Sequence, residues 1–303
     1  MTTADTTIGG GLTARLAHFY RRSEGARGLV LLTPTMLIML AALAAPLALL
    51  ALYSFWTQDG YVLDKTPTLA QYATGIGRAT YRELFYRSVE ISAVVTLITV
   101  LLAYPMAYFV AFRAEKKFIW LILLTIPFWT SYLLRVFTWK LILGYNGVIN
   151  SGLMSLGIIH QPLELLLYNP TAVVVTLAHA WAAFAILPIY VSLEKIDRSL
   201  LEAAADLGDG PIRRFFRITL PLSMPGVIGA AVLIFVPTTG DYITPSLVGG
   251  SGGVMIANVI EEQFDKVGNW PLGAALAIAS IAAVGIVTLL FVAAMRAAAA
   301  RIR

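Results

Sequence analysis

The polar stretch RSLLEAAADLGDGPIRRFFRITLP, residues 198–221, lies between two long apolar segments and decides the fold class. Charged side chains recur through it, at Glu202, Asp206, Asp209, Arg213, Arg214 and Arg217. Each charge would cost about 2.5–3.5 kcal/mol at the centre of a membrane helix. The stretch is therefore expected to lie outside a bilayer, although the segments on both sides are apolar enough to lie inside one.

A short amphipathic helix is predicted at the start of this stretch. Ser199 and Glu202 have the spacing of a capping box, in which each side chain bonds a backbone N–H at the helix start, so the helix is predicted to begin at Ser199. Apolar and acidic side chains then recur at helical spacing on opposite faces: Leu200, Ala203, Ala204 and Leu207 against Glu202, Asp206 and Asp209.

The end of this helix is predicted from Gly208 and Pro211. Gly208 can adopt the left-handed conformation that closes a helix, and Pro211 prevents simple continuation. A helix of about nine residues is too short to be stable alone in water. It therefore needs a surface to pack against, which is either the membrane domain of this chain or a partner protein.

Six apolar segments are long enough to cross a membrane. The chain of 303 residues is 58% hydrophobic and 13% charged, whereas about a quarter of the residues of a soluble domain are charged. About 20 apolar residues span the hydrocarbon core of a bilayer. The segments are 29–54, 89–112, 118–143, 171–193, 218–237 and 272–295. The expected fold class is an all-α membrane protein with six transmembrane helices.

Basic residues are distributed unequally between the two sides of these spans. Fifteen Lys and Arg residues fall in segment 1–28, turn 113–117, loop 194–217 and tail 296–303, against five on the other side. Because basic loops stay in the cytoplasm, both termini and loop 194–217 are expected to be cytoplasmic, with segment 55–88 periplasmic. The net charge of +5 reflects this topology and not nucleic-acid binding. The absence of cysteine excludes disulfides and thiolate metal sites.

Seven positions of the stretch resemble a known motif. Glu202-Ala203-Ala204, Gly208, and Ile218, Leu220 and Pro221 have the spacing of the E-A-A-x3-G-x9-I-x-L-P loop of permease subunits of bacterial ABC importers. The resemblance implies the type I permease fold over 89–295, placed in the inner membrane, with the short helix docked into a cytoplasmic ATPase. The implied coupling residues are Ser199, Glu202, Ala203, Ala204, Asp206, Leu207, Gly208, Arg213 and Arg214. Glu202 could cap its helix, contact the ATPase, or do both.

Four further segments are similar to the first permease of spermidine/putrescine-type systems: 126–139, 147–153, 235–250 and 258–277. This similarity implies a second permease subunit, two copies of an ABC ATPase and a substrate-binding protein outside the membrane, with lipid around the spans and no nucleic acid. The chain lacks a G-x4-G-K-[ST] motif. We therefore expect no enzymatic activity and no cofactor in this chain, with ATP and Mg²⁺ bound by the partner ATPase.

A polyamine path requires carboxylates and aromatic faces for the ammonium groups. Candidate residues for it are Asp241, Tyr242, Phe235, Trp129, Tyr132, Trp139, Trp181 and Tyr190. The segments expected outside carry a net charge of about −3, which slightly favours a cation. Arg135 and Lys140, within the third span, are expected to extend toward the outer interface. An opine, another amine or an anion stays open as the cargo.

Two other classes of membrane protein fit the sequence less well. An ion-coupled secondary carrier needs buried carboxylates, and no Asp or Glu lies near the middle of a predicted span. An intramembrane enzyme needs catalytic groups at membrane depth, and no such arrangement is visible. The three histidines are scattered without metal-ligand spacing, so no metal site is expected. His179 is expected to be a hydrogen-bonded packing residue.

Overall fold

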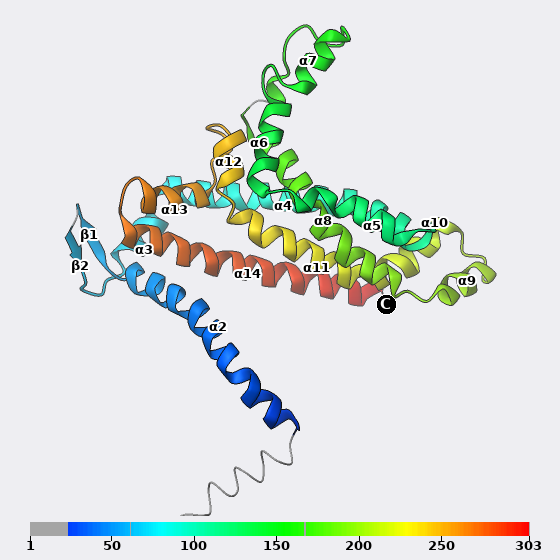
Figure 1. Cartoon of the computed structure of the whole chain (residues 1–303), viewed down its shortest axis with the longest axis horizontal. Coiled ribbons are helices and arrows are strands. Elements are labelled where there is room, and N and C mark those ends of the chain that lie inside the picture. The colour runs from blue at the N-terminus through cyan, green and yellow to red at the C-terminus, as the bar shows by residue number, and fades with distance from the viewer. Residues whose placement is uncertain (1–23, 61, 167, 303) are drawn as a thin grey trace, which may run out of the picture. The chain divides into compact units, whose positions relative to one another are not determined.

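The computed structural model describes residues 24–60, 62–166 and 168–302 (Figure 1). The chain divides into two compact units, Met1–Tyr53 and Ser54–Arg303. Of the first unit, the structure describes helix α2 (Glu24–Ser54), which contains Pro34 and Pro46. Most of the predicted cytoplasmic segment 1–28 lies outside the described residues, and its last residues already belong to α2.

The second unit is mainly helical, with a β-hairpin near its start. Its elements in chain order are β1 (Thr57–Asp59), β2 (Val62–Asp64), α3 (Ala70–Gly77), α4 (Ala79–Phe112), α5 (Lys117–Thr125), η1 (Ile126–Trp129), α6 (Tyr132–Leu143), α7 (Val148–Ser155), η2 (Glu164–Leu166), α8 (Pro170–Glu194), α9 (Arg198–Asp206), α10 (Pro211–Arg214), η3 (Phe215–Thr219), α11 (Leu220–Thr239), α12 (Ile243–Val248), α13 (Ile256–Asp265) and α14 (Trp270–Ile302). Among the described residues, five helices are long and apolar enough to cross a membrane, or six if one bent pair is a single span. The predicted all-α membrane class is confirmed.

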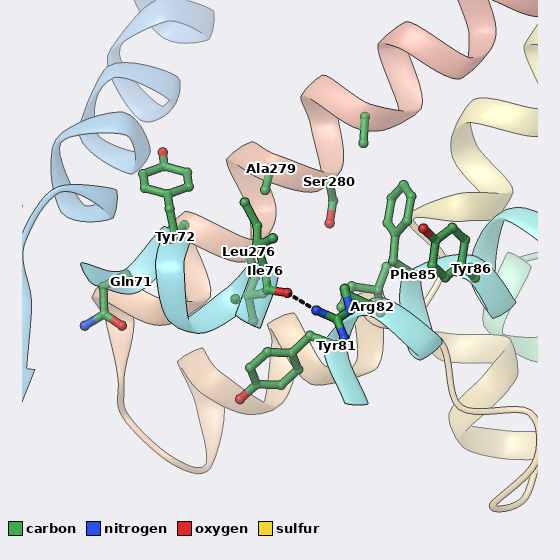
Figure 2. Close-up of a pocket in the computed structure, with 14 residues that line it drawn as sticks. Gln71, Tyr72, Ile76, Tyr81, Arg82, Phe85, Tyr86, Leu276, Ala279 and Ser280 are labelled. Carbon is green, nitrogen blue, oxygen red and sulfur yellow. Dashed lines mark hydrogen bonds between the residues drawn. The ribbon is translucent and has the colours of Figure 1, made fainter. Parts of the chain in front are cut away.

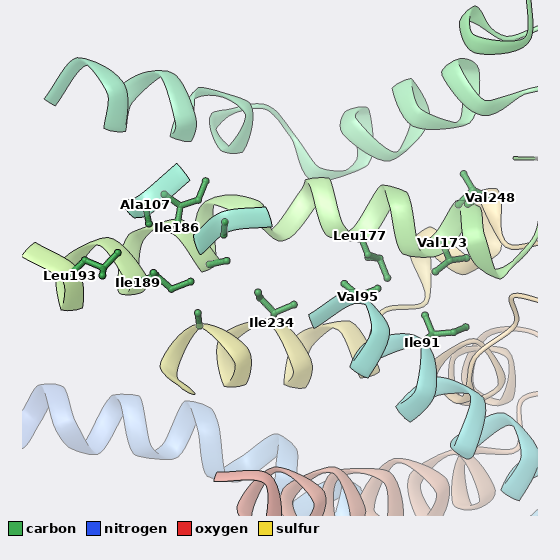
Figure 3. Close-up of a cluster of buried hydrophobic side chains, with 14 of the residues drawn as sticks. Ile91, Val95, Ala107, Val173, Leu177, Ile186, Ile189, Leu193, Ile234 and Val248 are labelled. Carbon is green, nitrogen blue, oxygen red and sulfur yellow. The ribbon is translucent and has the colours of Figure 1, made fainter. Parts of the chain in front are cut away.

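Helices α4, α8 and α11 form the packed centre of the second unit (Figure 3). Fully buried side chains come from all three helices: Val95 and Ala107 from α4, Leu177 from α8, and Ala230 and Ile234 from α11. Small residues such as Ala107 and Ala230 let membrane helices approach closely. Helices α8 and α11, which both line the Asp241 cavity described below, are therefore packed together.

Gly226 of α11 provides a direct test of this packing. A Cβ atom at Gly226 would lie 2.4 Å from the Pro188 carbonyl oxygen and 2.5 Å from Ser192 Oγ on α8. We expect Gly226→Ala to destabilise the protein by roughly 1–3 kcal/mol, because a well-packed core has no room for an extra carbon. Thermal unfolding in detergent measures the effect. Gly229→Ala is the matched control, since a Cβ there meets nothing within 4 Å; equal melting temperatures would contradict the packing.

The third predicted span is not one helix, which corrects the expected range 118–143. The chain forms α5 and η1, becomes extended at Thr130 and Ser131, and continues as α6 and α7 at an angle of 86°. Pro127 lies in the first turn of η1 and lacks a backbone N–H, so it cannot continue the hydrogen bonding of α5. The break frees backbone carbonyl groups that need new partners.

Arg135 supplies those partners, which shows that the expected outward extension of its side chain is wrong. Arg135 is buried, with 8% of the residue exposed. Its guanidinium donates hydrogen bonds to the carbonyl oxygens of Phe128 (3.1 Å), Thr130 (3.0 Å) and Ala180 (2.9 Å). These hydrogen bonds connect the broken third span to α8. They are stronger than bonds from a neutral donor because the guanidinium is charged.

Several other helix bounds differ from those expected. Helix α4 begins at Ala79 and not at 89, and α14 continues through Ile302 beyond the predicted end at 295. Helix α11 extends past Pro237 to Thr239, and the π-helical turn η3 precedes it. Hydropathy predicts only the part of a helix that lies in lipid, whereas the backbone hydrogen bonds of these helices continue into polar sequence.

Candidate functional site: the EAA loop and the Asp241 cavity

The helix of the EAA loop (residues 194–217) is capped differently from the prediction. Helix α9 spans Arg198–Asp206, and its N-cap is Asp197, whose side chain accepts a hydrogen bond of 3.0 Å from the Ser199 N–H. This hydrogen bond lowers the pKa of Asp197 below its ordinary value. The predicted Ser199–Glu202 capping box is therefore wrong, because an Asp two residues before Ser199 takes the capping position. Glu202 is exposed and free of that role.

The end of α9 follows the prediction at Gly208. Gly208 has a φ of +87°, in the left-handed region that glycine adopts without strain. The Gly208 N–H donates to the Ala205 carbonyl and the Asp209 N–H donates to the Ala204 carbonyl, each at 2.9 Å. This pair of bonds is a Schellman motif, which ends the helix and fixes the direction of the chain after it.

The predicted apolar face of α9 is largely uncovered by the described part of this chain. Leu200 is 47% exposed, Leu207 is 87% exposed, and Ala203 is also exposed. Of the four apolar residues predicted on this face, Ala204 is the buried one, at 7% exposed. Ile212, in the neighbouring helix α10, is also exposed, at 75%. Exposed apolar side chains at helical spacing on one helix face are typical of a protein–protein contact.

The basic residues of the loop contact the loop itself. Arg213 lies 3.6 Å from Asp209, and Arg214 donates a hydrogen bond of 3.2 Å to the Leu201 carbonyl. Asp206 is exposed. The coupling residues predicted from the sequence are thus brought together in one small unit, α9 with α10.

A cavity of about 460 Å³ lies where the third span breaks, and is called here the Asp241 cavity. Its walls come from the broken third span, from α8 and from the end of α11, and its lining residues are Phe128, Thr130, Tyr132, Arg135, Ala180, Trp181, Phe184, Pro237 and Asp241. Three of the predicted path residues, Tyr132, Trp181 and Asp241, line it together. Aromatic rings and a carboxylate around one space suit a cation with an apolar stem.

The carboxylate of Asp241 is held in place by two elements. Tyr132 of α6 donates its hydroxyl hydrogen bond to Asp241 Oδ2, and the same hydroxyl lies 2.7 Å from Thr244 Oγ1. Asp241 Oδ1 accepts the backbone N–H of Ile243, at 2.9 Å, at the start of α12. The carboxylate is therefore oriented before any cargo arrives, which reduces the entropy lost on binding.

The other predicted path residues lie elsewhere. Trp129 is 86% exposed, and Phe235 lines a separate apolar cavity between α4, α11 and α14. Trp139 donates its indole N–H to His179 Nδ1 at 3.0 Å, so His179 is a hydrogen-bonded packing residue as predicted. Tyr190 packs against the buried centre. Tyr242 does not line the Asp241 cavity, and its backbone carbonyl accepts a hydrogen bond from the Asn258 side chain.

Sequence reasoning missed Arg135, Phe128, Phe184 and Thr130 as cavity residues. The feature of the sequence that indicates a break in the third span is segment 127–131, where a proline and two hydroxyl residues interrupt an apolar run. Among the described residues, no group of three His, Asp or Glu side chains could hold a metal ion.

A second cavity, of about 320 Å³, lies between α3, α4 and α14 (Figure 2). Tyr72, Tyr81 and Tyr86 line it, together with Arg82, which donates a hydrogen bond of 3.0 Å to the Ile76 carbonyl. The described residues that line this cavity include no carboxylate. It therefore suits a cationic cargo less well than the Asp241 cavity does.

Comparison with known proteins gives the class of this chain. Residues 27–303 match the model of the family described as the binding-protein-dependent transport system inner membrane component. The chain therefore belongs to this family and is a type I ABC importer permease of the inner membrane.

Similar proteins include the spermidine/putrescine transport system permease protein PotB of Haemophilus influenzae, 35% identical over 235 residues, which cover 77% of this chain and 82% of that protein. PotB of Escherichia coli is 35% identical over 239 residues, covering 78% of this chain and 86% of that protein. The Escherichia coli permease protein YdcU is 32% identical, and 84% of each chain is covered.

A crystal structure of a bacterial ABC transporter that imports alginate has a chain similar in fold. The TM-score is 0.71 at 15% identity, and the match covers 93% of this chain and 98% of that chain. At this identity the similarity shows the fold alone.

Proposed function

We propose that this permease imports a polyamine of the spermidine/putrescine class. The observation that supports the proposal most is the Asp241 cavity, where one oriented carboxylate lies beside Tyr132, Trp181 and Phe128. The similarity to PotB proteins, which are named for spermidine and putrescine, points to the same cargo. Cation–π contacts and a carboxylate are what an ammonium group requires.

The energy for import is proposed to come from a partner ATPase. The exposed apolar face of α9, with Leu200 and Leu207, would dock into that ATPase, which would bind the ATP and Mg²⁺. This chain would itself be no enzyme. Both termini and the EAA loop would then be cytoplasmic, as the distribution of basic residues predicts.

The assembly is proposed to contain this permease, a second permease, two ATPase copies and a soluble binding protein outside the membrane. The match to a family of binding-protein-dependent systems supports the external protein. A chain of the alginate transporter, found in complex with its ligand-bound periplasmic protein, shares this fold with a TM-score of 0.70. The translocation path would be completed by the second permease.

An anionic cargo is a second candidate because Arg135 also lines the Asp241 cavity. Two nitrogens of its guanidinium donate to three backbone carbonyls, whereas its Nε has no hydrogen-bond partner and stays available to an anion. The aromatic rings around Asp241 and the similarity to PotB proteins favour a cation. The polyamine proposal is therefore the better supported of the two.

Asp241→Asn tests the cargo directly. We expect it to reduce ATP-driven uptake of radiolabelled spermidine by about tenfold or more, because a hydrogen bond to a charged group contributes about 1.5–3 kcal/mol. The measurement uses vesicles that contain the full transporter with its binding protein. Asp59→Asn, the same change in the β-hairpin, is the control and should keep uptake. Unchanged spermidine uptake by Asp241→Asn, or faster uptake of an anion, would overturn the polyamine proposal.

A further inference from the structure

The connection between α9 and the fifth span is short and contains two glycines, Gly208 and Gly210, on either side of Asp209. Glycine allows many backbone conformations, so this connection needs contacts that hold it. One restraint is the Asp209 N–H, which donates to the Ala204 carbonyl at 2.9 Å. This hydrogen bond fixes the position of Asp209 relative to α9. It does not fix the direction of the chain after Gly210.

The side chain of Asp209 supplies the second restraint. Its carboxylate lies 3.6 Å from Arg213 and 3.3 Å from Arg217, one contact to each oxygen. The Asp209 side chain is 8% exposed, whereas the two arginine side chains are 74% and 73% exposed. A carboxylate so covered interacts more strongly with nearby charges than an exposed one does, because less water screens it.

The two arginines belong to the start of the fifth span. Arg213 is in α10 and Arg217 is in the π-helical turn η3, which leads directly into α11. Arg214, between them, donates to the Leu201 carbonyl of α9 at 3.2 Å. Arg214 thus contacts α9 itself, whereas Arg213 and Arg217 contact Asp209, which follows α9 in the chain.

The base of the fifth span is in turn held to α4. The ring of Phe215 packs edge-on against Tyr104 and Tyr108, with centroid distances of 5.6 Å and 6.2 Å. The Tyr104 hydroxyl lies 2.8 Å from Ser223 Oγ of α11. A displacement of the base is therefore transmitted to two of the three packed helices of the centre.

We infer that Asp209 is a positioning residue, which fixes the angle between α9 and the fifth span through Arg213 and Arg217. The inference rests on the proposed docking of α9 to an ATPase. With the carboxylate in place, a push on α9 moves α11 and α4. Without it, the Arg214–Leu201 hydrogen bond is left as the side-chain tie described above, and the two glycines let α9 turn further before the membrane helices follow. Less cargo is then imported for each ATP hydrolysed.

The test is the ratio of cargo imported to ATP hydrolysed in the reconstituted full transporter with spermidine as cargo. We expect Asp209→Asn to lower this ratio about fivefold, at the low end of the coupling found between distant sites, while ATPase binding is kept. Glu115→Gln, which removes an exposed acid from the link between α4 and α5, should keep the ratio. The double change Asp209→Arg with Arg217→Asp should restore most of the ratio lost in Asp209→Arg.

A normal ratio in Asp209→Asn would overturn the inference. If Asp209→Asn fails to assemble, recovery of assembly and transport in the charge-swapped double variant supports the inference, and a double variant as defective as Asp209→Arg contradicts it. A wild-type transporter that takes up nothing with ATP, or a chain that does not bind the ATPase, would instead sink the proposed function itself. The two failures are therefore distinguishable.

Discussion

Gly208→Val is expected to abolish most ATP-driven uptake, by about tenfold or more, while the subunit still inserts and folds in the membrane. A β-branched residue at a φ of +87° is strained by about 1–3 kcal/mol. The strain would be relieved by loss of the Schellman motif, which would displace Leu207 and Asp209. A Cβ at Gly208 meets nothing within 4 Å, so the effect comes from the backbone and not from a clash.

The controls for this change use the same loop. Gly210→Val is the matched control. It introduces the same side chain at a residue with a φ of −66°, where an added Cβ would also meet nothing within 4 Å. Gly208→Asn should keep most of the uptake, because Asn tolerates the left-handed conformation. Uptake and co-purification of the ATPase are measured together. Normal uptake in Gly208→Val would count directly against docking through α9.

Arg135→Met is expected to destabilise the protein by at least about 3 kcal/mol, because three hydrogen bonds from a charged group to backbone carbonyls are lost, the one to Ala180 being buried. The break in the third span would lose its link to α8, and the Asp241 cavity would lose its shape. The predicted result is a lower melting temperature in detergent together with loss of uptake.

Two companion variants isolate the cause. Lys140→Met removes a positive charge from the same helix, α6, and should leave the melting temperature near that of the wild type. Arg135→Lys keeps the charge but lacks the planar fork that reaches several carbonyls, so an intermediate melting temperature is expected. If Arg135→Met melts no earlier than Lys140→Met, the structural role given to Arg135 is wrong.

The helix of the EAA loop was predictable because its signals are local. Apolar spacing and Gly208 lie within about a dozen residues and specify both the helix and its end. The choice of cap was predicted wrongly because Asp197 and Ser199 are both good capping residues. A difference of two residues in the capping position, Asp197 in place of Ser199, decided whether Glu202 had a structural role.

The Asp241 cavity was predictable only in its composition. Tyr132 and Asp241 are separated by 109 positions, and their contact depends on the angle of the break after Pro127. The same break turns Trp129 outward and brings Phe128 and Arg135 to the cavity. Hydropathy treats residues 118–143 as one apolar run and carries no information about that angle.

That this chain is a subunit of an ATP-driven importer is tested most directly by spermidine uptake into vesicles that contain this chain with its second permease and ATPase. We expect spermidine uptake that requires ATP and the binding protein and is unaffected by collapse of proton and sodium gradients. Uptake driven by such a gradient in the absence of ATP would contradict it and would indicate a secondary carrier.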